Sequence, residues 1–140
     1  MGFGHEKLNV YSLSIAYVAW VYEKAKSLNG IHRAARDQWL RASQSIPLNI
    51  AEGNGKATEA DRRRFFEIAR GSVLECAAIQ DVLVVGHALI EEESRDRKIE
   101  LNRMAAMLTG LGGRGYCVKE EEGIYECGGF DRDRDRDRDP

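Results

Sequence analysis

Apolar residues recur at intervals of three and four from residue 5 to residue 111, which is the spacing of one face of an α-helix. The recurrences form four segments, and glycines follow the first, second and fourth, as they do at helix C-termini. The pattern predicts helices over residues 5–28, 32–53, 59–91 and 95–111. Because the connections are short, we expect an all-α fold, an antiparallel up-down four-helix bundle.

The first and third predicted helices are apolar on two sides. The two rows of the first are Leu8, Tyr11, Ile15, Val18, Tyr22 and Ala25, and Val10, Ser14, Tyr17 and Val21. Those of the third are Phe65, Ile68, Ser72, Cys76, Ile79, Leu83, Gly86 and Ile90, and Phe66, Ala69, Val73, Ala77 and Val84. A helix with two apolar sides is covered on both. The pattern therefore predicts a subunit interface as well as an internal core, and a ring oligomer fits it.

The central stretch, residues 45–56, combines an apolar row with a polar one and contains Pro47, which predicts a kink because proline lacks an N–H. The apolar row is Ile46, Ile50 and Gly53, and the polar row is Ser45, Asn49 and Glu52. The polar row is either a ligand or partner surface, or an interior clasp at a helix end. We favour the clasp, because half-buried polar residues more often serve packing than chemistry.

The 140 residues predict a single domain, with the bundle over residues 1–112 and a different kind of sequence over 113–140. Gly115–Val118 and Gly123–Cys127 are candidates for a small hairpin across three glutamates. The Asp-Arg repeat that follows has nothing apolar to bury, so we expect a disordered tail. This tail is either an ionic arm for a partner or, as we favour, a solubilising segment.

The net charge of −2 is unevenly distributed. Residues 1–116 carry 16 basic and 14 acidic side chains, whereas residues 117–140 carry 5 and 9. The strongest basic cluster lies around the start of the third predicted helix and is the candidate nucleic-acid site; it comprises Lys56, Arg62, Arg63, Arg64 and Arg70. The alternative, slightly favoured because acidic residues lie among these side chains, is a solvated, salt-bridged face.

The sequence offers no catalytic, metal or cofactor site. The three histidines lack the Glu-x-x-His spacing of di-iron bundles, and no phosphate loop or nucleophile motif is present. Cys76 is expected in the core, and Cys117 and Cys127 are either bridged or reduced. No apolar run approaches the length of a membrane span, and the N-terminus lacks the pattern of a signal peptide, so we expect a cytoplasmic protein without a membrane partner.

Three motifs together resemble a bacterial four-helix-bundle family. They are Ser45-Ile46-Pro47-x-Asn49-Ile50-Ala51-Glu52-Gly53, the third helix with Gly71-Ser72 and Glu75, and the ending Leu101…Met107-Leu108-x-Gly110-Leu111. Members include proteins encoded in intervening sequences of large-subunit ribosomal RNA genes and the accessory variability determinant of diversity-generating retroelements. The resemblance implies a homopentamer without enzymatic activity. In the retroelement branch, it also implies a reverse transcriptase and its template RNA as partners.

Two functional hypotheses follow from these observations. The first is an oligomeric accessory protein that binds nucleic acid, a reverse transcriptase or both through the basic cluster. The second is a structural oligomer that scaffolds another protein without touching nucleic acid. Salt separates the two hypotheses, because phosphate binding weakens steeply with salt and apolar docking does not.

Overall fold

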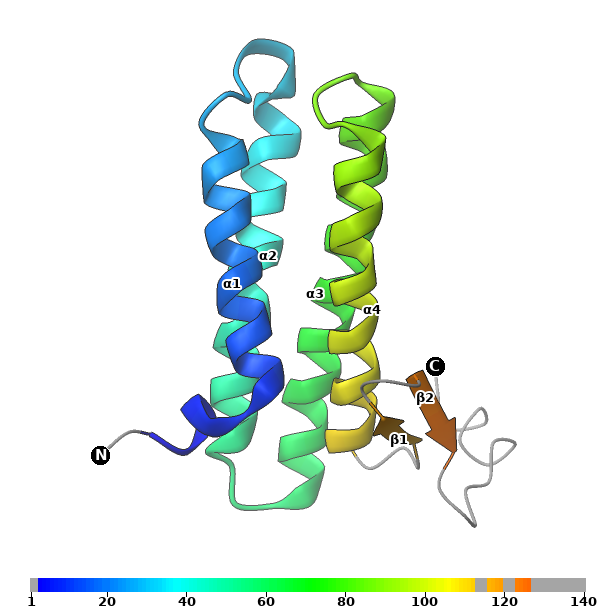
Figure 1. Cartoon of the computed structure of the whole chain (residues 1–140). Coiled ribbons are helices and arrows are strands. Elements are labelled where there is room, and N and C mark those ends of the chain that lie inside the picture. Colours follow the sequence, from blue (N-terminus) through cyan, green and yellow to red (C-terminus); the bar gives the residue numbers. More distant parts are fainter. Residues whose placement is uncertain (1–2, 113–115, 120–122, 127–140) are drawn as a thin grey trace.

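The computed structural model describes residues 3–112, 116–119 and 123–126, and this part of the chain contains four long helices (Figure 1). They are α1 (Asn9–Ala25), α2 (Arg33–Asn54), α3 (Glu59–Val85) and α4 (Glu91–Leu111). Short 3-10 helices, η1 (Gly4–Lys7) and η2 (Gly30–His32), precede α1 and α2. The connections between the long helices lie at alternating ends of the molecule, and together the helices form a four-helix bundle.

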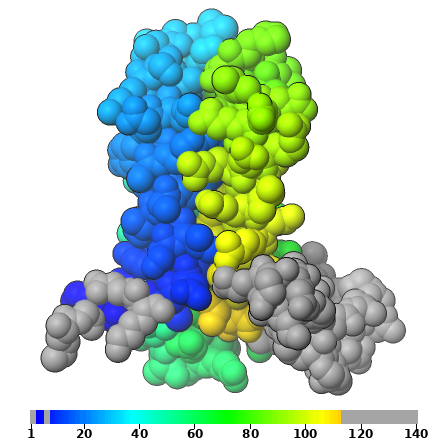
Figure 2. Space-filling view, in the orientation of Figure 1, coloured from blue at the N-terminus to red at the C-terminus, as the bar shows by residue number. Residues whose placement is uncertain are grey.

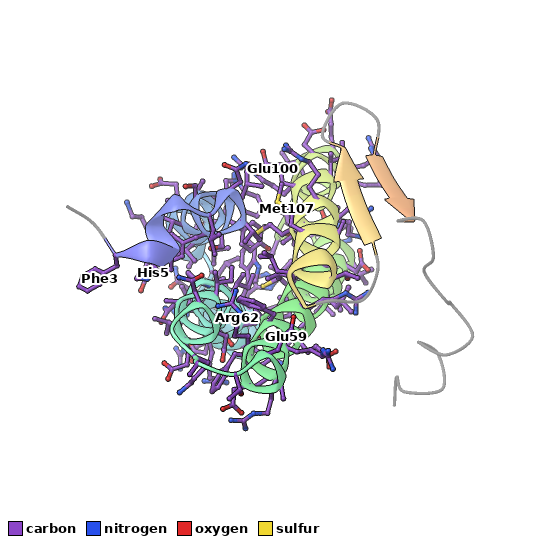
Figure 3. The ribbon with its side chains drawn as sticks, turned by 90° about the horizontal axis from the view of Figure 1, so that it is seen from below. Phe3, His5, Glu59, Arg62, Glu100 and Met107 are labelled. Atoms are coloured by element: carbon purple, nitrogen blue, oxygen red, sulfur yellow. The ribbon has the colours of Figure 1, made fainter. Side chains whose placement is uncertain are left out.

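Each long helix packs against its neighbour in sequence, and α4 closes the bundle against α1. Figure 2 shows α1 and α4 side by side along one face of the molecule. Seen from one end, α1 and α3 occupy diagonally opposite corners (Figure 3). The outward faces of α1 and α3 therefore point to opposite sides of the bundle.

The core side of α1 is the row that contains Val10, Tyr17 and Val21, all of which are buried. Of the other row, Ile15 is 44% exposed and Tyr22 is 51% exposed in the single chain; the sequence predicts a subunit interface for this helix as well as a core. Both rows are apolar, so hydrophobicity alone does not select the one that faces α2 and α4. The apolar row of the central stretch, Ile46, Ile50 and Gly53, is buried, as expected, and α2 continues as one helix through the buried Pro47.

The boundary between the third and fourth helices differs from the prediction. α3 ends at Val85, and the chain turns through Gly86 and His87, whose φ is 62°. Glu91, Glu92 and Glu93, expected at the end of the third helix, form the first turn of α4. The helix dipole explains the difference, because carboxylates stabilise a helix N-terminus and destabilise a C-terminus.

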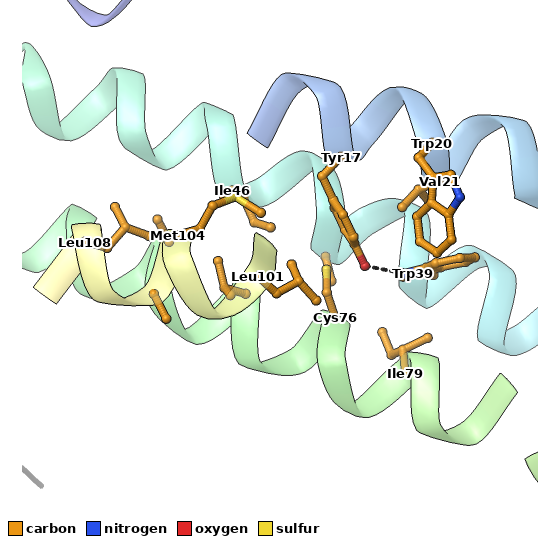
Figure 4. Close-up of a cluster of buried hydrophobic side chains, with 14 of the residues drawn as sticks. Tyr17, Trp20, Val21, Trp39, Ile46, Cys76, Ile79, Leu101, Met104 and Leu108 are labelled. Carbon is orange, nitrogen blue, oxygen red and sulfur yellow. Dashed lines mark hydrogen bonds between the residues drawn. The ribbon is translucent and has the colours of Figure 1, made fainter. Parts of the chain in front are cut away.

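A polar network crosses the apolar core and links all four helices. Figure 4 shows one part of it, the hydrogen bond between Tyr17 and Trp39, among the buried hydrophobic side chains. The Tyr17 hydroxyl donates to Gln80 Oε1 at 2.5 Å and accepts the indole N–H of Trp39 at 3.0 Å. Gln80 Nε2 in turn donates to the carbonyl oxygen of Ser94 at 3.1 Å and to its hydroxyl at 3.0 Å. All four residues are buried, so each polar group needs the partner that another helix supplies.

Glu93 joins the first turn of α4 to α1. Its Oε2 accepts the indole N–H of Trp20 at 3.0 Å and lies 2.8 Å from Lys24 Nζ. The Arg97 guanidinium lies over the Trp20 ring, 4.9 Å from its centroid. Partial burial would raise the pKa of Glu93, but hydrogen bonds from Lys24 and Trp20 and the charges of Lys24 and Arg97 hold it below its usual value. The carboxylate is therefore the form that links the two helices.

Beyond α4, strand β1 (Tyr116–Lys119) pairs antiparallel with β2 (Gly123–Glu126), with Val118 opposite Ile124. This is the place where the sequence predicts a hairpin. β1 lies against α4. The three glutamates between the strands, Cys127 and the Asp-Arg repeat fall outside the described residues.

Candidate nucleic-acid interface

The predicted basic cluster lies at the end of the bundle where α2 is connected to α3, the end viewed in Figure 3. Lys56 belongs to the connection, and the three consecutive arginines 62–64 lie in the first two turns of α3. Thr58 caps this helix, because its Oγ1 accepts the backbone N–H of Asp61 at 3.2 Å. The cap fixes the start of α3 at Glu59, as the sequence predicts, and thereby sets the direction in which the arginines project.

Two of the arginines bind the carbonyl ends of other helices. Arg62 Nη1 donates to the carbonyl oxygen of Asn54, the last residue of α2, at 3.2 Å. Arg63 Nε donates to the carbonyl oxygen of Gly112, directly after α4, at 2.9 Å. The last carbonyls of a helix lack intrahelical partners and carry partial negative charge. Arg62 and Arg63 therefore stabilise the bundle end, whatever else they contact.

Two phenylalanines lie under the cationic groups. Lys56 Nζ lies 5.1 Å from the ring centroid of Phe65, and the guanidinium carbon of Arg64 lies 4.8 Å from the same centroid. The Arg62 guanidinium lies 5.5 Å from the ring centroid of Phe66, which is fully buried. Cation–π contacts of this kind hold long basic side chains in place while their charged groups stay near solvent.

Acidic side chains lower the positive charge of this end. Glu52 Oε2 lies 3.3 Å from Lys56 Nζ, and Glu59 and Asp61 are exposed in the first turn of α3. The structure therefore brings four of the five predicted basic residues together, with carboxylates among them. Arg70 lies two turns further along α3, where its Nε is buried.

The polar residues of the central motif lie between α2 and α3. Asn49 Nδ2 donates to the carbonyl oxygen and to the hydroxyl of Ser45, both at 2.9 Å. Ser72 Oγ on α3 donates to the same hydroxyl at 2.9 Å. Glu52 is exposed and pairs with Lys56 instead. Apart from Glu52, these polar groups satisfy one another across a helix contact.

The apolar residues of the motif, Ile46, Pro47, Ile50 and Gly53, are buried. At Gly53 a Cβ atom would lie 2.9 Å from Cε1 of Phe66 and 3.1 Å from Cβ of Phe65, which is closer than packed carbon atoms approach. The glycine therefore allows α2 and α3 to pack closely directly beneath the basic cluster. The buried residues of the motif therefore stabilise the packing of α2 against α3 at this end of the bundle.

Sequence reasoning missed the buried network of Tyr17, Trp39, Gln80 and Ser94. Gln80 is the sequence feature that could have indicated this network, because a glutamine next to Ile79 on the core side of a helix needs a hydrogen-bond partner. Burial raises the pKa of the Tyr17 hydroxyl and raises the pKa of the neighbouring Cys76 thiol to about 12. Both groups are therefore neutral, and the Cys76 thiol is unsuited to act as a nucleophile.

Within the described residues, no three histidine, cysteine or acidic side chains group as metal ligands would. None of the described helices has the length and apolarity that a membrane crossing requires.

The fold and the basic end of the bundle together define the class of protein: a small helical bundle with basic and aromatic side chains around the α2–α3 connection. The chain belongs to the 23S rRNA-intervening sequence protein family, because the family model matches residues 6–110. This result confirms the ribosomal-intervening-sequence part of the resemblance seen in the sequence. The family description names no catalytic activity.

A solved structure supports the fold. The chain is similar to a protein of unknown function from the S23 ribosomal protein family of Bacteroides thetaiotaomicron, whose crystal structure was determined at 1.70 Å. The two share 19% sequence identity and a TM-score of 0.68 over 74% of this chain and 94% of the other. No curated protein matches the sequence.

Proposed function

We propose that this chain is a non-enzymatic, homo-oligomeric protein that binds RNA through the basic end of an antiparallel bundle. The observation that carries the proposal is the set of basic side chains gathered around Phe65 and Phe66 at the α2–α3 connection. Basic groups interleaved with aromatic rings suit a phosphate backbone. The family description, which refers to ribosomal RNA, supports the same class of partner. A reverse transcriptase is the protein partner that the retroelement resemblance implies.

The outward faces of α1 and α3 support self-association. The outward row of α3 is small or apolar and exposed over more than four turns; it comprises Ile68, Gly71, Leu74, Ala78, Val82 and Val85. At Gly71 a Cβ atom would have no neighbour within 4 Å, so the position leaves room for another backbone. The outward row of α1 is similar and comprises Ile15, Ala16, Ala19 and Tyr22.

Because these two rows lie at diagonal corners, each bundle can contact one neighbour through α1 and another through α3. Contacts between two different faces are heterologous, and they close into a ring when the rotation allows it. The resemblance implies five protomers. In a ring the basic ends repeat, so several weak patches act together, and avidity compensates for the modest charge of one chain.

The test is a titration of fluorescently labelled single-stranded RNA with the purified protein at 50 and 200 mM salt, after light scattering has established the mass of the assembly. We expect an oligomer whose RNA affinity falls steeply with salt, since each neutralised phosphate contributes about 0.7 to the slope of log affinity against log salt. Absence of binding at 50 mM salt by an intact oligomer would refute the RNA-binding role.

The second candidate is an oligomeric scaffold that binds another protein through its apolar surface. Exposed apolar side chains outside the two self-association rows favour it, among them Ile31, which is 92% exposed, and Leu48, which is 66% exposed. Retention of a protein partner at high salt, together with absence of RNA binding at low salt, would distinguish this candidate from the first.

A further inference from the structure

The five basic residues of the cluster are not equivalent. Arg62 and Arg63 have guanidinium donors directed to the carbonyl oxygens of Asn54 and Gly112. Arg62 is half-buried above Phe66. Donors that already bind protein carbonyls can contact a phosphate only by giving up a helix cap or by using their remaining N–H groups.

Lys56 and Arg64 are organised differently. Both lie against the half-buried Phe65 ring, one from the α2–α3 connection and one from α3. Their charged groups lie within about 5 Å of one ring centroid, and therefore within about 10 Å of each other. A side chain already held against a ring loses less conformational entropy when it binds a ligand.

We infer that Lys56 and Arg64, positioned by Phe65, are the pair that contacts the phosphodiester backbone of RNA, and that Arg62 and Arg63 act chiefly as helix caps. This inference rests on the proposed RNA-binding function. The guanidinium supplies a fork that matches phosphate oxygens, and the ammonium supplies a point charge beside it.

Glu52 competes with phosphate for Lys56 and therefore lowers the RNA affinity of this pair. Its carboxylate lies 3.3 Å from Lys56 Nζ and forms an ion pair with the ammonium group that a phosphate would contact. RNA binding therefore exchanges one anion for another at Lys56. Removal of the carboxylate leaves the ammonium without this competitor and raises the net charge of the site by one.

The experiment compares Arg64→Gln with Arg63→Gln, which remove the same charge from adjacent positions. Arg64→Gln is expected to lower RNA affinity and to reduce the salt slope by about 0.7 for each protomer that contacts RNA. Arg63→Gln is expected to lower the midpoint of thermal unfolding and to keep the salt slope, because it removes the cap at Gly112.

Two further variants test the arrangement itself. Phe65→Leu keeps an apolar side chain and every charge, so a loss of RNA affinity in a folded variant would come from the lost ring. Glu52→Gln is expected to raise RNA affinity above that of the wild-type protein. Circular dichroism and light scattering on each variant separate a binding defect from a loss of fold or assembly.

The outcomes distinguish the two levels of the proposal. If the wild-type protein binds no RNA, the proposed function fails and the pair has no ligand. If the wild-type protein binds RNA with a steep salt dependence that Arg64→Gln leaves unchanged, the proposed function stands and this assignment is overturned. An equal loss of slope in Arg63→Gln and Arg64→Gln would also overturn it, since the cluster would then act as undivided charge.

Discussion

The Tyr17 hydroxyl is the group on which the buried network depends, because it bonds to both Trp39 and Gln80. We expect Tyr17→Phe to lower the free energy of unfolding by about 1–3 kcal/mol, since it leaves a buried donor and a buried acceptor without their shared partner. Urea denaturation measures the change.

Tyr22→Phe is the matched control for this substitution. The Tyr22 hydroxyl also accepts a hydrogen bond, from Gln44 Nε2 at 3.0 Å, but the residue is half exposed. Its loss is expected to change the free energy of unfolding of the single bundle, measured at a protein concentration where light scattering shows a monomer, by less than about 0.5 kcal/mol, because water replaces the partner there. Equal effects of the two substitutions would contradict a special role for the network.

Gly53 tests the close contact of α2 with α3. Gly53→Ala is expected to destabilise the protein by about 1–3 kcal/mol, because the added methyl group would overlap the Phe66 ring. Gly55→Ala is the control, since a Cβ there would make only ordinary contacts, at 3.7 Å from the carbonyl oxygens of Ala51 and Glu52. Thermal unfolding of both variants provides the comparison, and a neutral Gly53→Ala would show that the two helices can separate without cost.

At the scale of the element, the first turn of α4 gives the stability a pH dependence. The folded-state pKa of Glu93 lies below its ordinary value of 4.5, so the stabilisation is present above pH 4.5 and is lost as the pH falls through the folded-state pKa. Glu93→Gln removes this contribution at every pH. The difference in unfolding free energy between wild type and Glu93→Gln is therefore expected to shrink between pH 7 and pH 3. A difference that stays constant over this range would exclude the mechanism.

The helices themselves were predictable from periodicity and from the residues that end them. The Thr58 cap fixed the start of α3 because its signal is local: one side chain and the backbone three residues later. The end of α3 was not predictable in the same way, since Val82, Val85 and Ile90 continue the apolar pattern through the turn. Those residues are exposed, at 60%, 79% and 69%, so the pattern there does not mark the core of the bundle.

The position of the candidate site was also predictable, because four of its basic residues lie close together in the sequence. Which of these basic residues bind backbone carbonyls of other helices was not predictable. Arg63 meets Gly112 across 49 positions of the sequence, and only the packing of α3 against α4 brings them together. A sequence gives the charge of such a side chain but not the carbonyl on which that charge acts.

At the scale of the whole molecule, the outward row of α3 predicts how assembly can be disrupted. Val82→Lys is expected to reduce the mass measured by light scattering to that of smaller species, because it places a charge in the proposed interface. Ile99→Lys is the control on α4: Ile99 is 61% exposed, close to the 60% of Val82, but lies outside the two rows. A monomeric wild-type protein, or an equal effect of both variants, would argue against self-association through α3.

The contact between Trp20 and Trp39 has a practical consequence. The chain contains two tryptophans, and their ring centroids lie 5.4 Å apart with the rings at 88° to each other. All intrinsic tryptophan fluorescence therefore originates at one point, where α1 meets α2 and where Glu93 of α4 bonds to the Trp20 indole. The natural chain thus carries its own optical reporter: a shift of its emission to longer wavelength registers the separation of these helices without any label.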